Sequence, residues 1–215
     1  MIIYVLVYTD DILITGNDPS LIQQTIQVLN SKFSLKTLGK VHYFLGFEAF
    51  RNSDGLYLTE TKYVHDLLVK TSMLNSKSCS TPTCSSVKLP AFSGAAFARP
   101  SVYRSARYQL CCESLSLFLA SPTVVHWQAC RRILHYLKGT LGLGPLFQLV
   151  GPLVLESYAD ADWASCVDDR RSTSGCCVFL GPNLITWYSR KQKVVSKSST
   201  EAEYRALSQA ATEVL

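Results

Sequence analysis

Hydrophobic and polar positions change their period several times along the chain. An alternating run rich in Ile, Val and Tyr at residues 4–16 predicts two strands joined by a turn. Apolar residues then recur every three or four positions from Leu21 to Phe33, behind Asp18 and Pro19, a pair typical of a helix N-terminus. Residues 42–59 return to strand-like texture with a turn at 53–55, and a second amphipathic helix follows.

The second half of the chain repeats the change from helix to strand. Residues 76–100 are rich in Ser, Thr, Pro, Ala and Gly, which predicts a linker or a long loop, and residues 124–138 read as a helix that ends at Gly139. Strands are expected at 153–164, 175–181 and 184–192, before a final helix from about Ser198. We therefore expect an α+β fold in three segments, 1–75, 76–150 and 151–215.

Composition narrows the class of protein. The 215 residues are 47% hydrophobic and 17% charged, enough to build packed cores, and no apolar run is long enough to span a membrane. The eight cysteines show no C-x-x-C spacing, so we expect reduced thiols rather than a zinc site. The net charge of +5 permits a polyanionic partner without requiring one.

Two adjacent aspartates, Asp10 and Asp11, interrupt the opening hairpin. They either punctuate a turn, which aspartate suits, or serve a site that needs both charges. The usual two-residue turn prefers Asn or Gly, and neither lies beside this pair. A carboxylate pair on a rigid hairpin tip also offers the hard oxygen ligands that Mg²⁺ binds, so metal binding is the second interpretation.

The sequence segments around this pair are similar to those of a known family. YTDDILITGND resembles the active-site box of reverse transcriptases, and LKTLGKVHYFLGFE followed by GLYLTETKYVHDLL resembles its continuation in copia-type LTR retrotransposon Pol polyproteins. The resemblance implies a partial reverse transcriptase palm, made of β-hairpins with helices, in which Asp10 and Asp11 are catalytic and bind Mg²⁺. The family more often has Val where Thr9 stands.

A second resemblance covers the C-terminal segment. SYADADWASCVDDRRSTSGCCVFLG and the block from LITWYSRKQ to EAEYRAL resemble the ribonuclease H domain of the same family. This implies a truncated ribonuclease H-like mixed sheet with a helix, in which Asp160 and Glu203 are catalytic and bind metal, with Asp162 a weaker candidate. Taken singly, Asp160 reads as a solvated strand end and Glu203 as a capping partner of Thr200.

Basic residues cluster near the predicted second site. The cluster consists of Arg190, Lys191, Lys193 and Lys197, beside Trp187 and Tyr188. Lysines commonly guard a solvated strand edge, and contact with nucleic-acid phosphate is the competing interpretation. Asp169 and its charged neighbours are expected to form a self-paired exposed loop.

Three departures from the family bear on activity. The family takes a third metal-binding aspartate from a strand before the hairpin and a further ribonuclease H aspartate after the Glu203 helix, and neither is present in this sequence. In the middle, codons for residues 107–112 read one nucleotide later can give the family peptide Asp-Ile-Ser-Phe-Ala-Val, so we expect a frameshifted, degenerate thumb or connection region.

Three functions follow from these expectations. The first is an RNA-directed DNA polymerase with ribonuclease H; the second, which the incomplete metal sites favour, is a catalytically inert part of a Pol polyprotein. The third is a domesticated nucleic-acid-binding module. RNA, DNA or an RNA–DNA hybrid would be the partner, missing Pol segments would be needed for activity, and an expressed chain would be cytoplasmic or nuclear.

Overall fold

The computed structural model describes residues 1–9, 11–83, 89–90, 94–104, 113–116 and 118–215. It is an α+β protein, as predicted, and its paired strands in the described ranges are antiparallel. The chain divides into two compact units, Met1–Phe50 and Arg51–Leu215. These units differ from the three segments expected from the sequence, whose boundaries stay a prediction. No helix in the described ranges is long and apolar enough to cross a membrane.

The first unit is built on the predicted hairpin. Strands β1 (Ile3–Tyr8) and β2 (Asp11–Gly16) pair antiparallel, and helix α1 (Pro19–Lys32) follows β2. Asp18 caps α1 as expected, because its Oδ1 accepts hydrogen bonds from the backbone N–H groups of Ser20 and Leu21 at 2.9 and 3.3 Å. The unit ends in the short pair β3 (Tyr43–Phe44) and β4 (Phe47–Arg51).

Almost none of this first unit is buried. Ala49 is its only buried residue in the described part of the chain, whereas apolar side chains of β1 such as Tyr4 and Val7 are each 65% exposed. The hairpin is therefore apolar on both faces, and α1 leaves much of that surface open to solvent.

The second unit begins with a tight turn and a small sheet. Asn52 Oδ1 accepts hydrogen bonds from the backbone N–H groups of Asp54 and Gly55, which confirms the predicted turn. Strand β5 (Leu56–Thr59) follows and pairs antiparallel with β6 (Leu146–Phe147), a two-residue strand that the sequence pattern did not predict.

Helices of the second unit enclose the main hydrophobic core. Helix α2 (Thr61–Lys70) and helix α5 (Val124–Gly139) pack together with the short α4 (Glu113–Ser116). Glu60 occupies the N-cap of α2 and makes no side-chain cap bond. The core members are Leu67, Leu68, Met73, Tyr103, Leu115, Phe118, Cys130 and Leu134.

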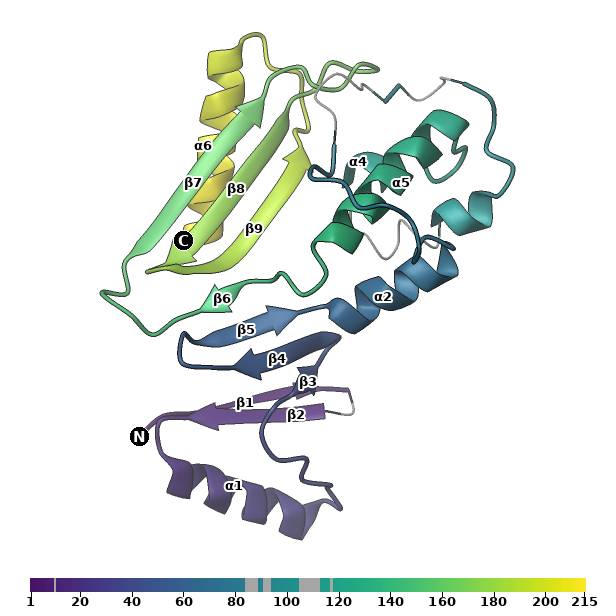
Figure 1. The fold of residues 1–215 in the computed structure, drawn as a ribbon. Coiled ribbons are helices and arrows are strands. Elements are labelled where there is room, and N and C mark those ends of the chain that lie inside the picture. Colours follow the sequence, from purple (N-terminus) through teal and green to yellow (C-terminus); the bar gives the residue numbers. More distant parts are fainter. Residues whose placement is uncertain (10, 84–88, 91–93, 105–112, 117) are drawn as a thin grey trace. The chain divides into compact units, whose positions relative to one another are not determined.

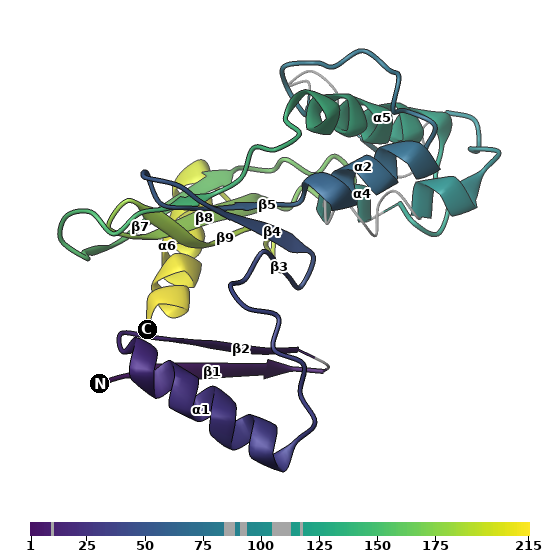
Figure 2. The same ribbon diagram turned by 60° about the horizontal axis from the view of Figure 1, so that its bottom comes forward.

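The C-terminal part of this unit is a three-stranded sheet covered on one side by a helix. Strands β7 (Leu155–Asp162), β8 (Thr173–Leu180) and β9 (Asn183–Lys191) are all antiparallel, so these strands do not form the mixed sheet that was predicted. Short connections join the consecutive strands, and such connections allow only antiparallel pairing. Helix α6 (Ser199–Val214) lies behind β7 and β8 in Figure 1. Figure 2 shows the same helix and sheet after a turn that brings the bottom of Figure 1 forward.

Small residues bring α6 close to the sheet. Ala202 and Ala206 pack on Ala161 of β7, and Ala210 packs on Cys176 and Val178 of β8. Alternation along β8 leaves Cys177 on the opposite face, half-buried, as expected for a cysteine doublet in a strand. The five cysteines in the described ranges are free thiols. The remaining three, at positions 84, 111 and 112, lie outside the described residues, as does the proposed frameshift.

Candidate functional site

The first predicted site stands at the tip of the β1–β2 hairpin. Tyr8 pairs with Asp11 as the last pair of the ladder, which leaves Thr9 and Asp10 between the strands. Thr9 has a φ of +40°, a left-handed conformation that β-branched residues rarely adopt. A two-residue hairpin requires positive φ near its start, so Thr9 takes the role for which the sequence offered no Asn or Gly. Asp10 itself lies outside the described residues.

Asp11 is an accessible carboxylate. Its side chain is exposed, and it has neither an ion pair nor a side-chain hydrogen bond within the described part of the chain. A carboxylate in this position keeps its oxygens available to an external cation or to solvent. That Asp10 and Asp11 act together on a metal ion stays a prediction.

The second predicted site lies at the end of β7. Asp160 and Asp162 are exposed and flank the buried Ala161, so both aspartates lie on the face that α6 leaves uncovered. The strand alternation expected for the two aspartates is thus confirmed. Both carboxylates lack ion pairs in the described ranges.

Glu203 lies in α6 beyond the helix cap. Ser198 is the N-cap, and its hydroxyl accepts a hydrogen bond from the backbone N–H of Glu201 at 3.1 Å. The carboxylate of Glu201 in turn accepts from the backbone N–H of Lys197 at 2.8 Å. Glu203 is exposed and takes no part in this cap, so the alternative in which it partners Thr200 is wrong.

Two neighbouring glutamates therefore have different roles in α6. The backbone N–H of Lys197 and the guanidinium of Arg205 hold the pKa of Glu201 below its ordinary value. Glu201 therefore stabilises the helix terminus, whereas the side chain of Glu203 makes no hydrogen bond or ion pair in the described ranges. Asp160, Asp162 and Glu203 do not form a three-donor metal group, and no other group of three or more His, Cys, Asp or Glu side chains in the described ranges is arranged to hold a metal ion.

The predicted basic cluster on β9 is partly neutralised. Arg190 forms an ion pair with Glu213 of α6 at 3.1 Å and lies over the ring of Tyr188. Lys191 forms an ion pair with Asp169 at 2.7 Å. Lys193 and Lys197 are exposed and form no side-chain ion pair in the described ranges. Two of the four cations are thus engaged within the protein.

The loop before β8 is tied to β9 as well as to itself. Asp169 pairs with Arg171 at 3.1 Å, as expected for a self-paired loop, and also with Lys191, which was not expected. The ammonium group of Lys191 holds the pKa of Asp169 well below its ordinary value. Lys191 also donates to the sulfur of Cys166 at 3.0 Å, so two residues of this loop are bound by one lysine of β9.

Gln192 is a positioning residue that the sequence reading missed. It is buried, its Nε2 donates to Ser174 Oγ at 3.0 Å and to the Ala202 carbonyl at 2.9 Å, and its Oε1 accepts from Ser196 Oγ at 2.9 Å. These bonds fix the first turn of α6 against β8. In the sequence, Gln192 lies between lysines and gives no sign of burial.

Comparison with known proteins identifies the family. Residues 1–85 match the family model described as reverse transcriptase (RNA-dependent DNA polymerase). The chain is 44% identical over 225 aligned residues to the retrovirus-related Pol polyprotein from transposon RE1 of Arabidopsis thaliana, covering 99% of this chain and 15% of that protein. The chain thus spans less than a fifth of the length of this relative.

Shorter relatives match over most of their own length. A putative transposon Ty5-1 protein of Saccharomyces cerevisiae is 31% identical, with 99% of this chain and 74% of that protein covered. An uncharacterized mitochondrial protein of Arabidopsis thaliana is 38% identical over 98% of this chain and 92% of its own length. No solved structure matches significantly. The chain belongs to the copia-type retrotransposon Pol polyproteins, and its first 85 residues belong to their reverse transcriptase region.

Proposed function

We propose that the chain carries parts of two metal-dependent sites of a retrotransposon Pol polyprotein. Asp10 and Asp11 would serve RNA-directed DNA synthesis, and Asp160 with Glu203 would serve cleavage of the RNA strand in an RNA–DNA hybrid. The reverse transcriptase match over residues 1–85 supports the first assignment. The second rests on the resemblance of residues 157–207 to ribonuclease H.

The available side chains suit magnesium. Asp11, Asp160 and Glu203 are exposed carboxylates without ion pairs in the described ranges, and carboxylate oxygens are the hard ligands that Mg²⁺ prefers. Mg²⁺ commonly binds through one or two carboxylates and completes its shell with water and substrate phosphates. When bound, it would supply charge stabilisation to the attacking and leaving oxygens of phosphoryl transfer.

We infer that the 215-residue chain is by itself catalytically inert and retains affinity for nucleic acid. The observation that carries this inference concerns the second site: within the described residues, Asp160, Asp162 and Glu203 belong to no group of three or more donors arranged for a metal. Each predicted site contributes two carboxylates, and further Pol segments would supply the remaining ligands. A two-metal site holds the reacting oxygens only when its coordination geometry is fixed.

Activity and binding assays test this proposal together. Purified chain is assayed with Mg²⁺ for primer extension and for cleavage of an RNA–DNA hybrid, beside Asp11→Asn and Asp160→Asn. The matched control is Glu156→Gln, an exposed carboxylate of β7 outside both predicted sites. We expect no turnover from any of these proteins and salt-dependent binding by all of them. Magnesium-dependent product that disappears in Asp11→Asn or Asp160→Asn, but persists in Glu156→Gln, would show that the chain is an active enzyme.

A binding module without any Pol chemistry is the second candidate. It is favoured by the exposed Lys193 and Lys197, which form no side-chain ion pair in the described ranges. Adding the remaining Pol segments in trans separates the two candidates. Restored turnover supports the incomplete enzyme, and binding that never leads to turnover supports the module.

A further inference from the structure

Positive charge is concentrated in the middle of the chain. Between Leu67 and Leu155 there are nine Lys or Arg residues and one acidic residue, Glu113, a net charge of +8 within a chain of net charge +5. The segments on either side are therefore acidic on balance. A chain that looks mildly basic as a whole carries one strongly basic region.

Helix α5 presents part of this charge as a stripe. Gln128, Arg131, Arg132 and His135 follow one another at spacings of three, one and three residues, so they share one face of the helix. The buried residues of α5, among them Cys130 and Leu134, lie on the other face and fill the core. The polar stripe is consequently held in place by a packed helix.

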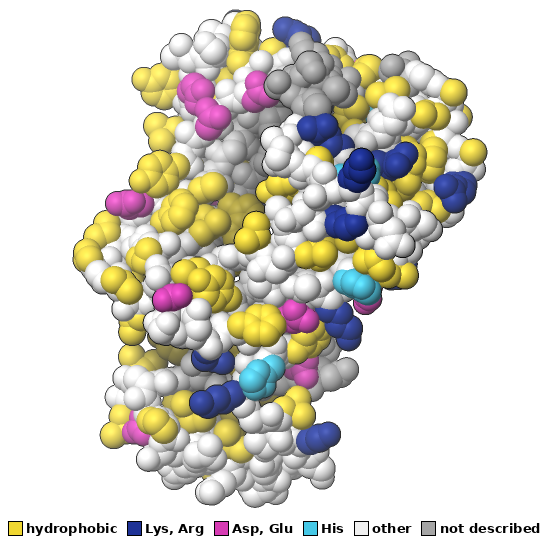
Figure 3. Space-filling model, in the orientation of Figure 1, with side chains coloured by type: hydrophobic (Ala, Val, Ile, Leu, Met, Phe, Trp, Pro, Cys, Tyr) yellow, Lys and Arg dark blue, Asp and Glu magenta, His cyan; other side chains and the backbone are white. Residues whose placement is uncertain are grey.

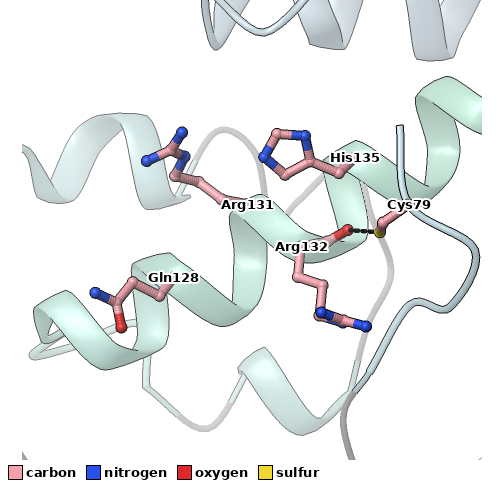
Figure 4. Close-up of a pocket in the computed structure, with 5 residues that line it drawn as sticks. All are labelled: Cys79, Gln128, Arg131, Arg132 and His135. Atoms are coloured by element: carbon pink, nitrogen blue, oxygen red, sulfur yellow. Dashed lines mark hydrogen bonds between the residues drawn. The ribbon is translucent and has the colours of Figure 1, made fainter. Parts of the chain in front are cut away.

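A groove runs along this stripe. It has a volume of about 300 Å³ and is lined by Gln128, Arg131, Arg132 and His135 of α5 and by Cys79 of the adjacent segment (Figure 4). Cys79 belongs to the stretch predicted as a linker, which here follows α5 closely, since the backbone N–H of Cys79 donates to the His135 carbonyl at 3.3 Å. The groove is thus formed by two segments distant in sequence.

Hydrogen bonds orient the basic side chains in the groove. Arg132 Nη2 donates to Thr81 Oγ1 at 2.7 Å, and His135 Nδ1 contacts the Lys77 carbonyl. Lys138, one turn further along α5, donates from Nζ to the Ser76 carbonyl. These partners are neutral oxygens, so they orient the cations without cancelling their charge.

No carboxylate balances the stripe in the described part of the chain. Arg131, Arg132, Lys77 and Lys138 take part in none of the ion pairs formed there. The Nε of Arg132 is buried and has no hydrogen-bond acceptor among the described atoms. Figure 3 shows Lys and Arg side chains gathered around a His on this face, without Asp or Glu among them. On β9, by contrast, Arg190 and Lys191 are paired with acids.

We propose that the α5 stripe binds the phosphodiester backbone of nucleic acid. The stripe is defined as Arg131, Arg132, His135 and Lys138 of α5 together with the exposed Lys77, whose backbone carbonyl contacts His135. The ligand class rests on the proposed function; the location rests on the charge and geometry of α5. From Arg131 to Lys138 the stripe extends about 10 Å along the helix axis. That length matches about three steps between successive phosphates of one strand, which lie about 3.4 Å apart along a duplex axis.

The stripe is expected to bind without reading sequence. Arginine forms bidentate hydrogen bonds with phosphate, which is common to all nucleotides. The side chain of Trp127, also in α5, is stacked on Phe97, and the centroids of the two rings are 4.9 Å apart. No exposed aromatic platform for base stacking is therefore offered by Trp127. Phosphate contacts position a nucleic acid and carry no sequence information.

Salt-dependent binding by the full chain tests the location. Anisotropy of labelled single-stranded DNA and of an RNA–DNA hybrid is measured between about 0.05 and 0.2 M salt, where each phosphate contact contributes about 0.7 to 0.9 to the logarithmic slope. Removing two contacts in Arg131→Gln with Arg132→Gln should lower the slope by about 1.5 and weaken binding at least tenfold. A second variant, Lys77→Gln with Arg131→Gln, keeps the hydrogen bond between Arg132 and Thr81. A similar loss of slope in this variant would show that the effect does not come from misfolding caused by loss of that bond.

One control variant removes the same charge elsewhere. Lys36→Gln with Lys40→Gln lies in the first unit and should keep the slope of the unaltered chain. Lys193→Gln with Lys197→Gln removes the exposed cations near β9 and tests the competing location; the slope should fall more in the α5 variants than in this one. If the α5 variants keep the slope and the Lys193 and Lys197 variant loses it, the location is wrong while nucleic-acid binding stands. If the unaltered chain binds heparin but neither nucleic acid, both the ligand class and the proposed function fail.

Discussion

At the scale of single residues, Gln192 shows how a buried amide fixes a helix. Its side chain is 1% exposed and makes hydrogen bonds to β8, to the first turn of α6 and to Ser196, which is also buried. All of its polar atoms are therefore satisfied inside the protein. Removing the amide leaves the Ser196 hydroxyl and the Ala202 carbonyl without these partners and out of reach of water.

Replacing Gln192 should therefore destabilise the second unit. We expect Gln192→Ala to lower the free energy of unfolding by about 2 kcal/mol, because buried polar groups lose their partners. Gln209→Ala on the exposed face of α6 is the matched control and should have little effect. Urea denaturation followed by circular dichroism measures both, and equal stability of the two variants would contradict the role assigned to Gln192.

Asp169 predicts a pH dependence in the loop before β8. Its pKa in the folded protein is held below the ordinary value of 3.8, first by Lys191. The ion pair therefore contributes stability above about pH 4, and this contribution is lost as the pH falls and Asp169 becomes protonated. Chemical shifts of the Asp169 and Lys191 side chains, followed by NMR from neutral to acidic pH, should report this change.

Asp169→Asn provides the control for this titration. The variant should lack the low-pH change at Lys191, while Asp168→Asn should retain it. A change in the Lys191 signal that is the same in all three proteins would assign the titration to another group.

Residue roles that depend on tertiary contacts were the least predictable from the sequence. Asp18 could be recognised as a cap because its partners lie two and three residues away. The roles of Gln192 and Lys191 could not be recognised in the same way. Gln192 forms hydrogen bonds with β8 and α6, and Lys191 forms an ion pair with Asp169, so their partners lie far from them in the sequence. The four basic residues at and after the end of β9 were predicted to form one cluster for the same reason. Two of them are neutralised by acids that are distant in the sequence, Arg190 by Glu213 and Lys191 by Asp169.

At the scale of elements, the contact between α6 and the sheet depends on small side chains. Ala202, Ala206 and Ala210 lie one turn apart and are buried against β7 and β8. Alanine at these positions lets the helix backbone approach the strands closely. A larger side chain there must displace either the helix or the sheet.

Enlarging the central alanine should loosen this contact. Ala206→Leu should lower the free energy of unfolding by about 1 to 3 kcal/mol through overpacking. Ala211→Leu, on the exposed face of the same helix, is the matched control and should be nearly neutral. Thermal unfolding of the two variants tests the difference; an unchanged melting temperature for Ala206→Leu would mean that α6 does not pack tightly.

Elements with strong local signals were predicted well. The helices from Pro19 and from Val124, the three C-terminal strands and the final helix all form, because each has a clear hydrophobic period and a recognisable start or stop. Strand β6 was missed because its two residues become a strand only by pairing with β5, nearly ninety residues earlier. The antiparallel sheet replaced the expected mixed sheet because short loops join β7, β8 and β9.

At the scale of the whole molecule, burial is unevenly distributed between the two units. Of the buried hydrophobic residues in the described ranges, all but Ala49 belong to Arg51–Leu215. A unit that buries little apolar surface gains little from the hydrophobic effect and cannot offset its conformational entropy. Stability is therefore expected to reside in the second unit.

Separate expression of the second unit tests this distribution. Residues 51–215 alone should unfold cooperatively, with a melting temperature close to that of the full chain. Residues 1–50 alone should show no cooperative transition, since only Ala49 is buried there in the described ranges. Loss of folding in residues 51–215 would show that the first unit contributes to stability after all.

The cysteine doublet of β8 places two identical thiols in different chemical surroundings. Cys176 lies beneath α6 and Cys177 faces the other way. A thiol-specific reagent therefore meets one sulfur while the helix shields its neighbour. Mass spectrometry of the labelled doublet therefore reports whether α6 is packed on the sheet. One adduct, at Cys177, indicates a packed helix, and two adducts indicate that α6 has separated from the sheet.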